Sequence, residues 1–551
     1  MSEFSQRLRE GRPPAKARRW LFVPYDQLHG DLGPLGCEPP GELGIVLVES
    51  RAKAARRPYH KQKLALVLAN LRHFALEQQA RGVAVRHVAT AGGYAEALAP
   101  LVAELGPLRV MRPAERELRA ELAPLVAAGA LVEIPHEGWL TTAADFAAVP
   151  GPPWRMDAFY RQVRRRTGVL MHRGKPIGGR FSFDVENRHR WRGEPSPPAE
   201  PTFAVDAITR EVCDLVAREF AAHPGALRPE HLPATGADAE GALHHALVHC
   251  LPHFGPFEDA MSTRSSGLFH TRLSPLLNLH RLLPSRVLAA VLAADLPLAS
   301  QEGFVRQLLG WREFVRHVHE ATDGLRHVGG TALANDTLHA DRDLPPVFWG
   351  GAPSGLQCLD HVVADVWREG WSHHITRLMV LGNLATLLGI SPRQLTDWFW
   401  VAYVDAFDWV VEPNVLAMAT YAVGDLMTTK PYVAGAAYLG RMGDYCGGCA
   451  FDPRTTCPIT RLYWAFLARH AERLAGNQRL AMPLRSVARR APAERARDAR
   501  VAALVQAALA RGERLDPPAA SDQDPVARTA VVPEDARRDA SAPGSTDGRD
   551  P

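Results

Sequence analysis

The chain has 551 residues, of which 46% are hydrophobic and 23% charged, with a formal net charge of +4. This globular composition predicts more than one domain, because a single core rarely grows beyond about 250–300 residues. The sequence has no apolar run of about 18 residues and no signal-peptide core, so neither a membrane protein nor a secreted one is expected. Seven cysteines are too few for a disulfide framework, which favours a reduced cytoplasm where clustered cysteines bind metal.

Residues 1–18 are polar and basic and predict a flexible arm. Between residues 19 and 150, short apolar runs alternate with amphipathic segments, beginning with "RWLFVPYDQL" and "GIVLVES" as strands and residues 60–82 as a helix. This alternation predicts an α/β, Rossmann-like domain with a parallel sheet and helices on both faces. The glycine pattern of the usual dinucleotide fingerprint does not follow the first strand.

Residues 151–204 interrupt this pattern with proline, glycine and charge, and predict an inter-domain connector. Between Arg161 and Arg192, ten Lys and Arg residues face only two acids. Two interpretations remain open for this basic stretch. It is either a solvated linker or a surface that neutralises phosphates of a polyanion.

Residues 205–485 show almost only helical periodicity, as in the stripe formed by Phe304, Leu308, Trp311, Val315 and Val318. They predict a large second domain that is entirely helical. No aromatic residue follows Phe466, and residues 486–551 are expected to be a mostly disordered tail with a short helix at 493–511.

Three cysteines stand close together near the end of the helical region. Cys446 and Cys449 form a C-x-x-C motif, and Cys457 is followed directly by Pro458. A Cys-Pro ending is common at iron–sulfur sites. For the fourth ligand we expect Cys358, at a loop-to-helix junction of the same domain. The other cysteines are an N-terminal-domain residue, Cys37, and two expected core residues, Cys213 and Cys250.

Four thiolates suit either a tetrahedral zinc ion or a [4Fe–4S] cluster. Zinc modules usually pair two C-x-x-C knuckles, whereas here one such motif joins two isolated cysteines. The pattern therefore favours an iron–sulfur cluster over zinc, with unliganded thiols as the third interpretation.

Several further segments, taken in order, carry a resemblance to a known family. They are "YHKQKLALVLANLRHFA", "GGRFSFDVENR", "HTRLSPLLN", "GWREFVR", "SHHITRLMVLGN", "VDAFDWVVEPNV", "TTKPY" and "LYWAFLARH", together with the cysteines. Over nearly all of residues 19–485 the chain resembles the iron–sulfur bacterial cryptochromes and photolyases, also called deoxyribodipyrimidine photolyase-related proteins. The resemblance implies a photolyase/cryptochrome fold, FAD in the helical domain and a [4Fe–4S] cluster held by Cys358, Cys446, Cys449 and Cys457.

The resemblance also implies which residues hold the cofactors. "HTRLS" resembles the flavin pyrophosphate segment, which assigns His270, Thr271, Arg272, Leu273 and Ser274 to FAD. Arg377 and Asp405 match an ion pair beside the flavin ring, Asp408 matches an acid at the ring edge, and Glu412 falls near flavin N5. Trp398 and Trp349 resemble members of an electron-transfer chain. A 6,7-dimethyl-8-ribityllumazine antenna is expected in a crevice lined by Gln27, Glu49, Tyr59, His60 and Lys63.

The residues assigned to catalysis are His373, His374, Trp311, Tyr432 and Gln307, with Arg312 beside them. An imidazole transfers protons near neutral pH, and a tryptophan stacks on a base that has left the duplex. The resemblance thus implies a lyase, similar to (6-4) photolyases, that repairs damaged DNA with light and acts as a cytoplasmic monomer. Two alternatives are a cryptochrome-like blue-light photoreceptor without repair activity and a non-catalytic iron–sulfur module that binds nucleic acid.

Overall fold

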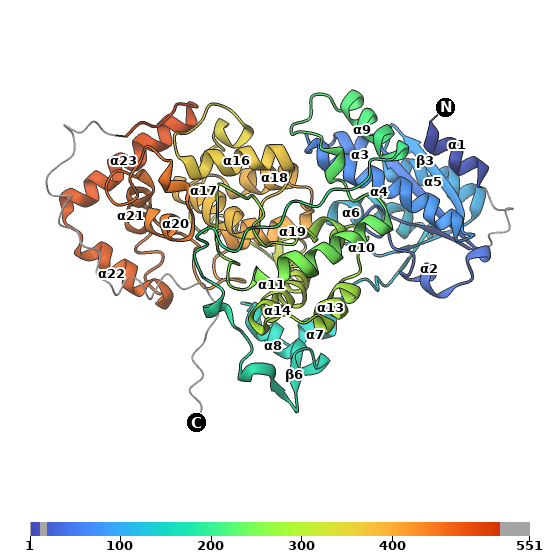
Figure 1. Ribbon diagram of the computed structural model, residues 1–551, viewed down its shortest axis with the longest axis horizontal. Coiled ribbons are helices and arrows are strands. Elements are labelled where there is room, and N and C mark those ends of the chain that lie inside the picture. The colour runs from blue at the N-terminus through green and yellow to red at the C-terminus, as the bar shows by residue number, and fades with distance from the viewer. Residues whose placement is uncertain (1, 12–18, 518–551) are drawn as a thin grey trace.

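The computed structural model describes residues 2–11 and 19–517 of the chain. A five-stranded sheet, blue in Figure 1, forms the N-terminal domain. Its strands are β1 (Arg19–Phe22), β2 (Leu43–Ser50), β3 (Ala84–Thr90), β4 (Leu108–Met111) and β5 (Leu131–Ile134). They pair in parallel in the order β3-β2-β1-β4-β5, which confirms the predicted α/β class.

Helices connect these strands and attach the sheet to the rest of the molecule. They are α2 (Pro34–Cys37), α3 (Arg51–Ala55), α4 (Lys61–Ala80), α5 (Tyr94–Leu105), α6 (Arg116–Ala127) and α7 (Ala143–Ala147). Most of α4 is buried, because it lies against β3 on one side and α9 (Ala207–Glu219) on another. At its start, Lys63 donates hydrogen bonds to the carbonyls of Trp400 and Ala406, so charged groups of α4 join the two domains.

The expected flexible arm is partly ordered. Residues Glu3–Glu10 form helix α1, whose Phe4 is only 1% exposed and lies over the Arg72 guanidinium. Burial of this single aromatic side chain, together with the Ser2 cap of the helix, explains an ordering that a polar composition did not predict. Residues 12–18 lie outside the described part of the chain.

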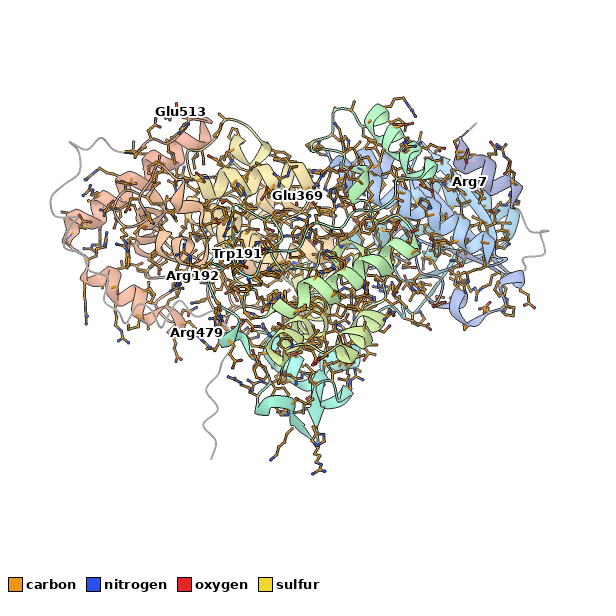
Figure 2. All side chains as sticks on the ribbon, in the orientation of Figure 1. Arg7, Trp191, Arg192, Glu369, Arg479 and Glu513 are labelled. Carbon is orange, nitrogen blue, oxygen red and sulfur yellow. The ribbon has the colours of Figure 1, made fainter. Side chains whose placement is uncertain are left out.

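The connector contains helix α8 (Met156–Thr167) and a hairpin of β6 (Met171–His172) and β7 (Lys175–Pro176), which projects at the bottom of Figure 1. Arg164 was counted among its basic surface residues, but its side chain is buried and donates to the carbonyls of Val169, Leu170 and Phe181. Arg164 therefore holds the connector's own backbone and is not available to a phosphate. Further along, Trp191 packs on Leu268 and Phe269, which ties the connector into the helical domain (Figure 2).

The second domain is helical, as predicted. Its first helices are α9, α10 (Gly236–His245), α11 (Leu251–Phe254), α12 (Ser274–Asn278), α13 (Pro284–Ala293), α14 (Leu298–Val305) and α15 (Glu313–Ala321). Later helices are α16 (Gln357–Glu369), α17 (Asn383–Leu388), α18 (Pro392–Ala402), α19 (Asp408–Val411), α20 (Ala436–Met442) and α21 (Pro458–Arg469). The short strands β8 (His327–Val328) and β9 (Thr331–Ala332) form a hairpin after α15.

Several helices contain wider π-helical turns, which are frequent at functional sites. The segments η6 (Arg306–Arg312), η8 (Thr376–Gly382) and η9 (Glu412–Ala419) have this form, as does η5 (Ala246–Cys250). Three of them, η6, η8 and η9, contribute side chains to one cavity that is described below.

The end of the chain is more ordered than its composition predicted. Helices α22 (Ala481–Arg489) and α23 (Pro492–Ala510) follow α21, and α23 packs against α21. Arg461 on α21 pairs with Glu494 and Asp498 on α23, and Val505 and Leu509 are buried. The short helix expected at 493–511 is thus present as α23, but it packs on the helical domain and is not part of a disordered tail, while residues 518–551 lie outside the described chain. Along residues 2–11 and 19–517 the structure has no helix long and apolar enough to cross a membrane.

Candidate functional site

A cavity of about 310 Å³ lies inside the helical domain. Its volume falls in the range of about 300–1,000 Å³ that is typical of ligand pockets. The segment from His270 to Asn278 forms one wall, η6 a second, and the segments around η8 and η9 the others. Twelve of the residues singled out in the sequence line it: His270, Thr271, Arg272, Leu273, Ser274, Gln307, Trp311, Arg312, His373, His374, Arg377 and Asp405.

The predicted Arg377–Asp405 pair is formed in the cavity wall. Two guanidinium nitrogens donate to the two carboxylate oxygens at 3.0 Å each. The third nitrogen, Nε, donates to the carbonyl of Ser372 at 2.7 Å, and the guanidinium lies 4.1 Å from the Tyr403 ring centre. Ser274 donates its hydroxyl to Asp405 at 2.6 Å, which links the predicted pyrophosphate segment to this ion pair.

The two adjacent histidines occupy different positions. His373 is buried, and its ring stacks on His270 with centroids 4.5 Å apart. Burial lowers the pKa of His373 well below its usual value, and the pKa of His270 falls to about 3 for the same reason. His374 also lines the cavity and is exposed there, but its enclosure by the surrounding protein and then the charge of Arg377 lower its pKa to about 4. All three rings are therefore neutral at pH 7.

One nitrogen of His373 stands out as a candidate contact for a ligand. Its Nδ1 is buried and finds no hydrogen-bond partner among the residues that the structure describes. Leaving such a group unpaired costs about 1–3 kcal/mol, so a partner from the cavity would stabilise it.

A buried carboxylate that the sequence analysis did not single out also faces the cavity. Glu258 accepts hydrogen bonds from Gln307 at 2.6 Å and from Asn187 at 3.1 Å, and Arg306 lies 3.4 Å away. Burial raises its pKa to about 7. Two sequence segments carry the residues of this contact. They are "GGRFSFDVENR", which contains Asn187, and "GPFEDAM", which contains Glu258.

Two acids assigned to the flavin lie outside the cavity lining. Asp408 begins α19 and accepts from the backbone amide of Glu117 at 3.0 Å, so it faces the α/β domain. Glu412 accepts from His319 at 3.0 Å and pairs with Arg326 and Arg393, on the side of the helix opposite the cavity.

The same helix turns Trp409, Val410, Asn414 and Val415 into the cavity instead. Asn414, two residues beyond Glu412, is the polar side chain that this stretch presents there. The π-helical turn η9 changes the helical phase along this stretch, which explains why sequence spacing did not give the face that Glu412 presents.

Other assigned residues surround the cavity without lining it. Tyr432 is buried near the charges of Asp184 and Arg188. Trp398 is fully buried and contacts Phe399, a lining residue, with ring centres 5.1 Å apart. Trp367 lies 6.0 Å from Trp398 and also 6.0 Å from Trp349, which is 47% exposed. An aromatic path thus runs from the cavity wall to the surface, through Trp367, which the sequence analysis did not assign.

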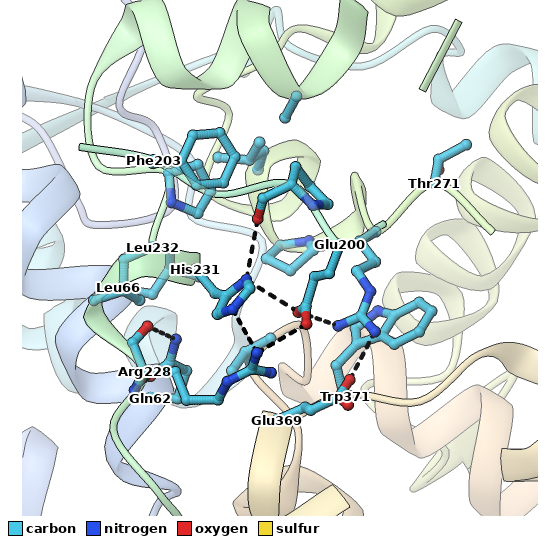
Figure 3. A pocket seen from close by; sticks show the side chains of 17 residues that line it. Gln62, Leu66, Glu200, Phe203, Arg228, His231, Leu232, Thr271, Glu369 and Trp371 are labelled. Atoms are coloured by element: carbon cyan, nitrogen blue, oxygen red, sulfur yellow. Dashed lines mark hydrogen bonds and ion pairs between the residues drawn. The ribbon is translucent and has the colours of Figure 1, made fainter. Parts of the chain in front are cut away.

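A second cavity of about 70 Å³ shares Thr271, Arg272 and Trp371 with the first (Figure 3). The Arg272 guanidinium lies between Glu200 and Glu369, at 2.7 Å from each, and 4.3 Å above the Trp371 ring. Arg228 and His231 also contact Glu200, at 3.0 and 3.5 Å. Arg272 therefore stabilises the wall between the two cavities, and its positive charge is paired with the carboxylates of Glu200 and Glu369.

The predicted antenna residues divide into two groups. Glu49 is buried against Arg72 and His87, and these hydrogen bonds outweigh burial and lower its pKa, so it acts as an internal ion-pair partner. Tyr59, His60 and Lys63 lie at the contact between the domains, where His60 bonds to the Trp367 carbonyl.

Gln27 lies just after β1 and donates to the Met111 carbonyl at 3.0 Å. Its Oε1, the Tyr25 hydroxyl and Asp26 Oδ1 are buried, and within the described chain they have no hydrogen-bond partner. Burial raises the pKa of Asp26 to about 6. These three atoms belong to consecutive residues at the carboxyl end of a parallel strand. Ligands of α/β sheets bind at such strand ends, and a ligand there could satisfy the three atoms.

The four predicted cysteine ligands come from two parts of the chain that meet in space. Cys358 is buried at the start of α16, and Cys449 Sγ lies 3.9 Å from the carbonyl of Gly355, just before that helix. Burial raises the pKa of Cys358 well above its usual value, and the three other thiols, Cys457, Cys446 and Cys449, raise it further. Within the described residues, however, no three His, Cys, Asp or Glu side chains form a site for a single metal ion.

Comparisons with known proteins agree on one family. The model of the deoxyribodipyrimidine photo-lyase-related protein family matches residues 21–232. A protein of Agrobacterium fabrum (strain C58) named (6-4) photolyase is 36% identical over 489 residues, which cover 85% of this chain and 95% of that protein. An uncharacterized protein of Acanthamoeba polyphaga mimivirus is 35% identical over 66 residues, 12% of this chain and 54% of its own length.

The fold is shared with a solved structure. A bacterial class III photolyase from Agrobacterium tumefaciens superposes with a TM-score of 0.54 at 16% identity, covering 90% of this chain and 99% of that one. This likeness confirms the predicted architecture of a parallel sheet followed by a large helical domain.

Proposed function

Because the chain belongs to the deoxyribodipyrimidine photo-lyase-related family and is a photolyase-like lyase, we propose that it repairs (6-4) pyrimidine photoproducts in DNA with light. The observation that carries this proposal is the cavity in which the Arg377–Asp405 pair, the histidines and Gln307 meet. FAD would supply the photoexcited electron when bound, and the protein would supply binding, orientation and protons.

The residues of the cavity fit a flavin. The doubly hydrogen-bonded Arg377–Asp405 pair provides a fixed donor and acceptor edge, and Ser274 and Asn278 hold Asp405 in place through its side chain and its carbonyl. We assign Asn414 to the position near flavin N5 in place of Glu412, because Asn414 lines the cavity and Glu412 does not. Segment 270–274 would lie along the pyrophosphate.

The neighbouring polar groups fit a flipped pyrimidine lesion. His373 offers its unpaired Nδ1, and His374 offers an imidazole whose lowered pKa makes it neutral until negative charge develops nearby. Gln307 is held by Glu258, to which its amide nitrogen donates a hydrogen bond of 2.6 Å. The carbonyl of Gln307 is then free to accept from the lesion, and Trp311 supplies a stacking surface.

Trp398, Trp367 and Trp349 supply a route for electrons between the solvent and the cavity. Their ring centres follow one another at 6.0 Å, and the last tryptophan is exposed. Photoreduction of the flavin should therefore slow when Trp367 is replaced by Phe.

For the cysteines, we propose a [4Fe–4S] cluster, because a single C-x-x-C motif joins two isolated cysteines and the four thiols lie close enough to act on one another electrostatically. A lumazine antenna, for its part, would lie at Tyr25–Gln27, where the unpaired atoms are, with Glu49 acting only through its ion pairs.

The test is an anaerobic repair assay. The reduced, FAD-containing protein is mixed with an oligonucleotide that carries one (6-4) lesion, and loss of the lesion is measured under blue light and in the dark. Light-dependent loss is expected. Flavin photochemistry without any loss of the lesion would favour the alternative, a photoreceptor without repair activity.

A further inference from the structure

A short turn in the connector carries an exposed apolar side chain. Val185 is the middle residue of the turn Asp184–Glu186 (η3), and its side chain is 72% exposed, more than any other large hydrophobic residue in the described chain. The flanking residues are the acids Asp184 and Glu186, whose charges are paired with Arg188 and Arg306 and with Arg180, respectively. A single exposed valine is ordinary on a protein surface, so its meaning depends on where this turn is fixed.

The turn is fixed to the wall of the large cavity on both sides of Val185. Before it, the backbone amide of Phe183 donates to Glu302 at 3.0 Å, and Asp184 pairs with Arg306 at 3.4 Å. After it, Asn187 donates to Glu258 at 3.1 Å. Glu258 lines the cavity, and Arg306 precedes Gln307, which lines it as well.

The surroundings of the turn also fit a DNA surface. Tyr432 lies close enough to the turn for the charges of Asp184 and Arg188 to act on it. The connector that carries the turn holds the excess of Lys and Arg noted above, including Arg165, and its basic hairpin projects from the molecule (Figure 1). Such residues would hold the phosphates on either side of Val185.

A base that reacts inside a cavity must leave the helical stack, and its departure leaves a gap in the duplex. DNA-bending proteins often compensate for this unstacking by inserting an apolar side chain between base steps. Building on the proposed repair function, we propose that Val185 is a wedge that fills the gap left in duplex DNA by the flipped lesion. The fixed turn keeps the valine in position, so little ordering is needed on binding.

A wedge acts only where there is a stack to fill, which gives a sharp test. Dissociation constants are measured in the dark for one lesion presented in duplex and in single-stranded DNA. The Val185→Ser protein should bind the lesion duplex about tenfold more weakly and the lesion single strand as the wild type does. Val185→Leu should keep duplex affinity. Leu504→Ser, at a 70% exposed position on α23, is the matched control and should change neither.

Fluorescence of 2-aminopurine placed opposite the lesion gives a second readout, because a filled gap keeps this base stacked. Val185→Ser should raise the fluorescence of the bound duplex relative to wild type. Equal losses of affinity for both DNA forms, or no loss for the duplex, would overturn the wedge. Failure of the proposed function looks different, because the wild type would then show no light-dependent repair of the lesion in a single strand either.

Discussion

Replacing Arg377 by alanine should empty the flavin site while leaving the fold intact. The substitution removes both hydrogen bonds to Asp405 and leaves that carboxylate, which is 4% exposed, with the Ser274 hydroxyl as its remaining side-chain donor among the described residues. Breaking a buried ion pair on one side costs about 3–5 kcal/mol. Because the Arg377 side chain is 21% exposed, we expect the lower end, about 3 kcal/mol.

If this cost falls on FAD binding, affinity drops about a hundredfold, since each 1.4 kcal/mol is a factor of ten. The assay is the ratio of flavin absorbance to protein in the purified variant, followed by FAD titration of the apoprotein. Arg461→Ala is the control, because Arg461 is 19% exposed and pairs with two acids far from the cavity. It should lower stability and keep FAD. An Arg377→Ala protein with wild-type flavin content and a cooperative unfolding transition would refute the reasoning.

Three further predictions concern other parts of the molecule. Cys358→Ala should yield protein without iron and with reduced solubility, whereas Cys213→Ala should keep about four irons per chain; metal analysis that finds zinc alone would contradict this. Replacing the connector residues Arg165, Arg173 and Lys175 by Glu should weaken binding to damaged and undamaged DNA alike and make the affinity less dependent on salt. An unchanged salt dependence would identify the connector as a solvated linker. Burial raises the pKa of Glu258 to about 7, so between its ordinary pKa and pH 7 the folded protein holds a proton on Glu258 that the unfolded chain has released. The free energy of unfolding therefore falls as the pH rises towards 7. Glu258→Gln should therefore gain stability relative to wild type between pH 5 and 8 in denaturant titrations, and parallel curves would argue against this pKa.

The α/β class and the helical domain could be predicted because their signals are local. Alternating apolar runs and the stripe containing Phe304 and Trp311 need no knowledge of distant contacts. Helix α1 was not predicted, and α23 was expected only as an isolated helix in a disordered tail, because each is stabilised by packing on another element, through Phe4 and Leu509. Composition alone gave no indication of those partners.

Within the site, the resemblance identified twelve residues of the cavity lining, and side-chain direction accounts for the two assigned acids, Asp408 and Glu412, that lie outside it. Glu412 and Asn414 are two residues apart and lie on opposite faces of the helix. An error of two residues in the alignment therefore assigns to the cavity the residue that contacts His319. Arg164 is one of three consecutive arginines, and the carbonyls that bury its guanidinium come from a turn that no spacing rule predicts.

The central claim is that one cavity both binds the flavin and carries out the proton chemistry of repair. It is tested most directly by the yield of repaired dipyrimidine, measured by mass spectrometry per absorbed photon, in FAD-replete wild type and His373→Ala protein. A positioned group that transfers a proton contributes about 10²–10⁴-fold, and negative charge on the reduced lesion would raise the pKa of the neutral His373 ring. We therefore predict repair by the wild type and a loss of at least a hundredfold in the variant, with flavin and lesion still bound. Equal yields from the two proteins, or no repair by the wild type, would contradict the account.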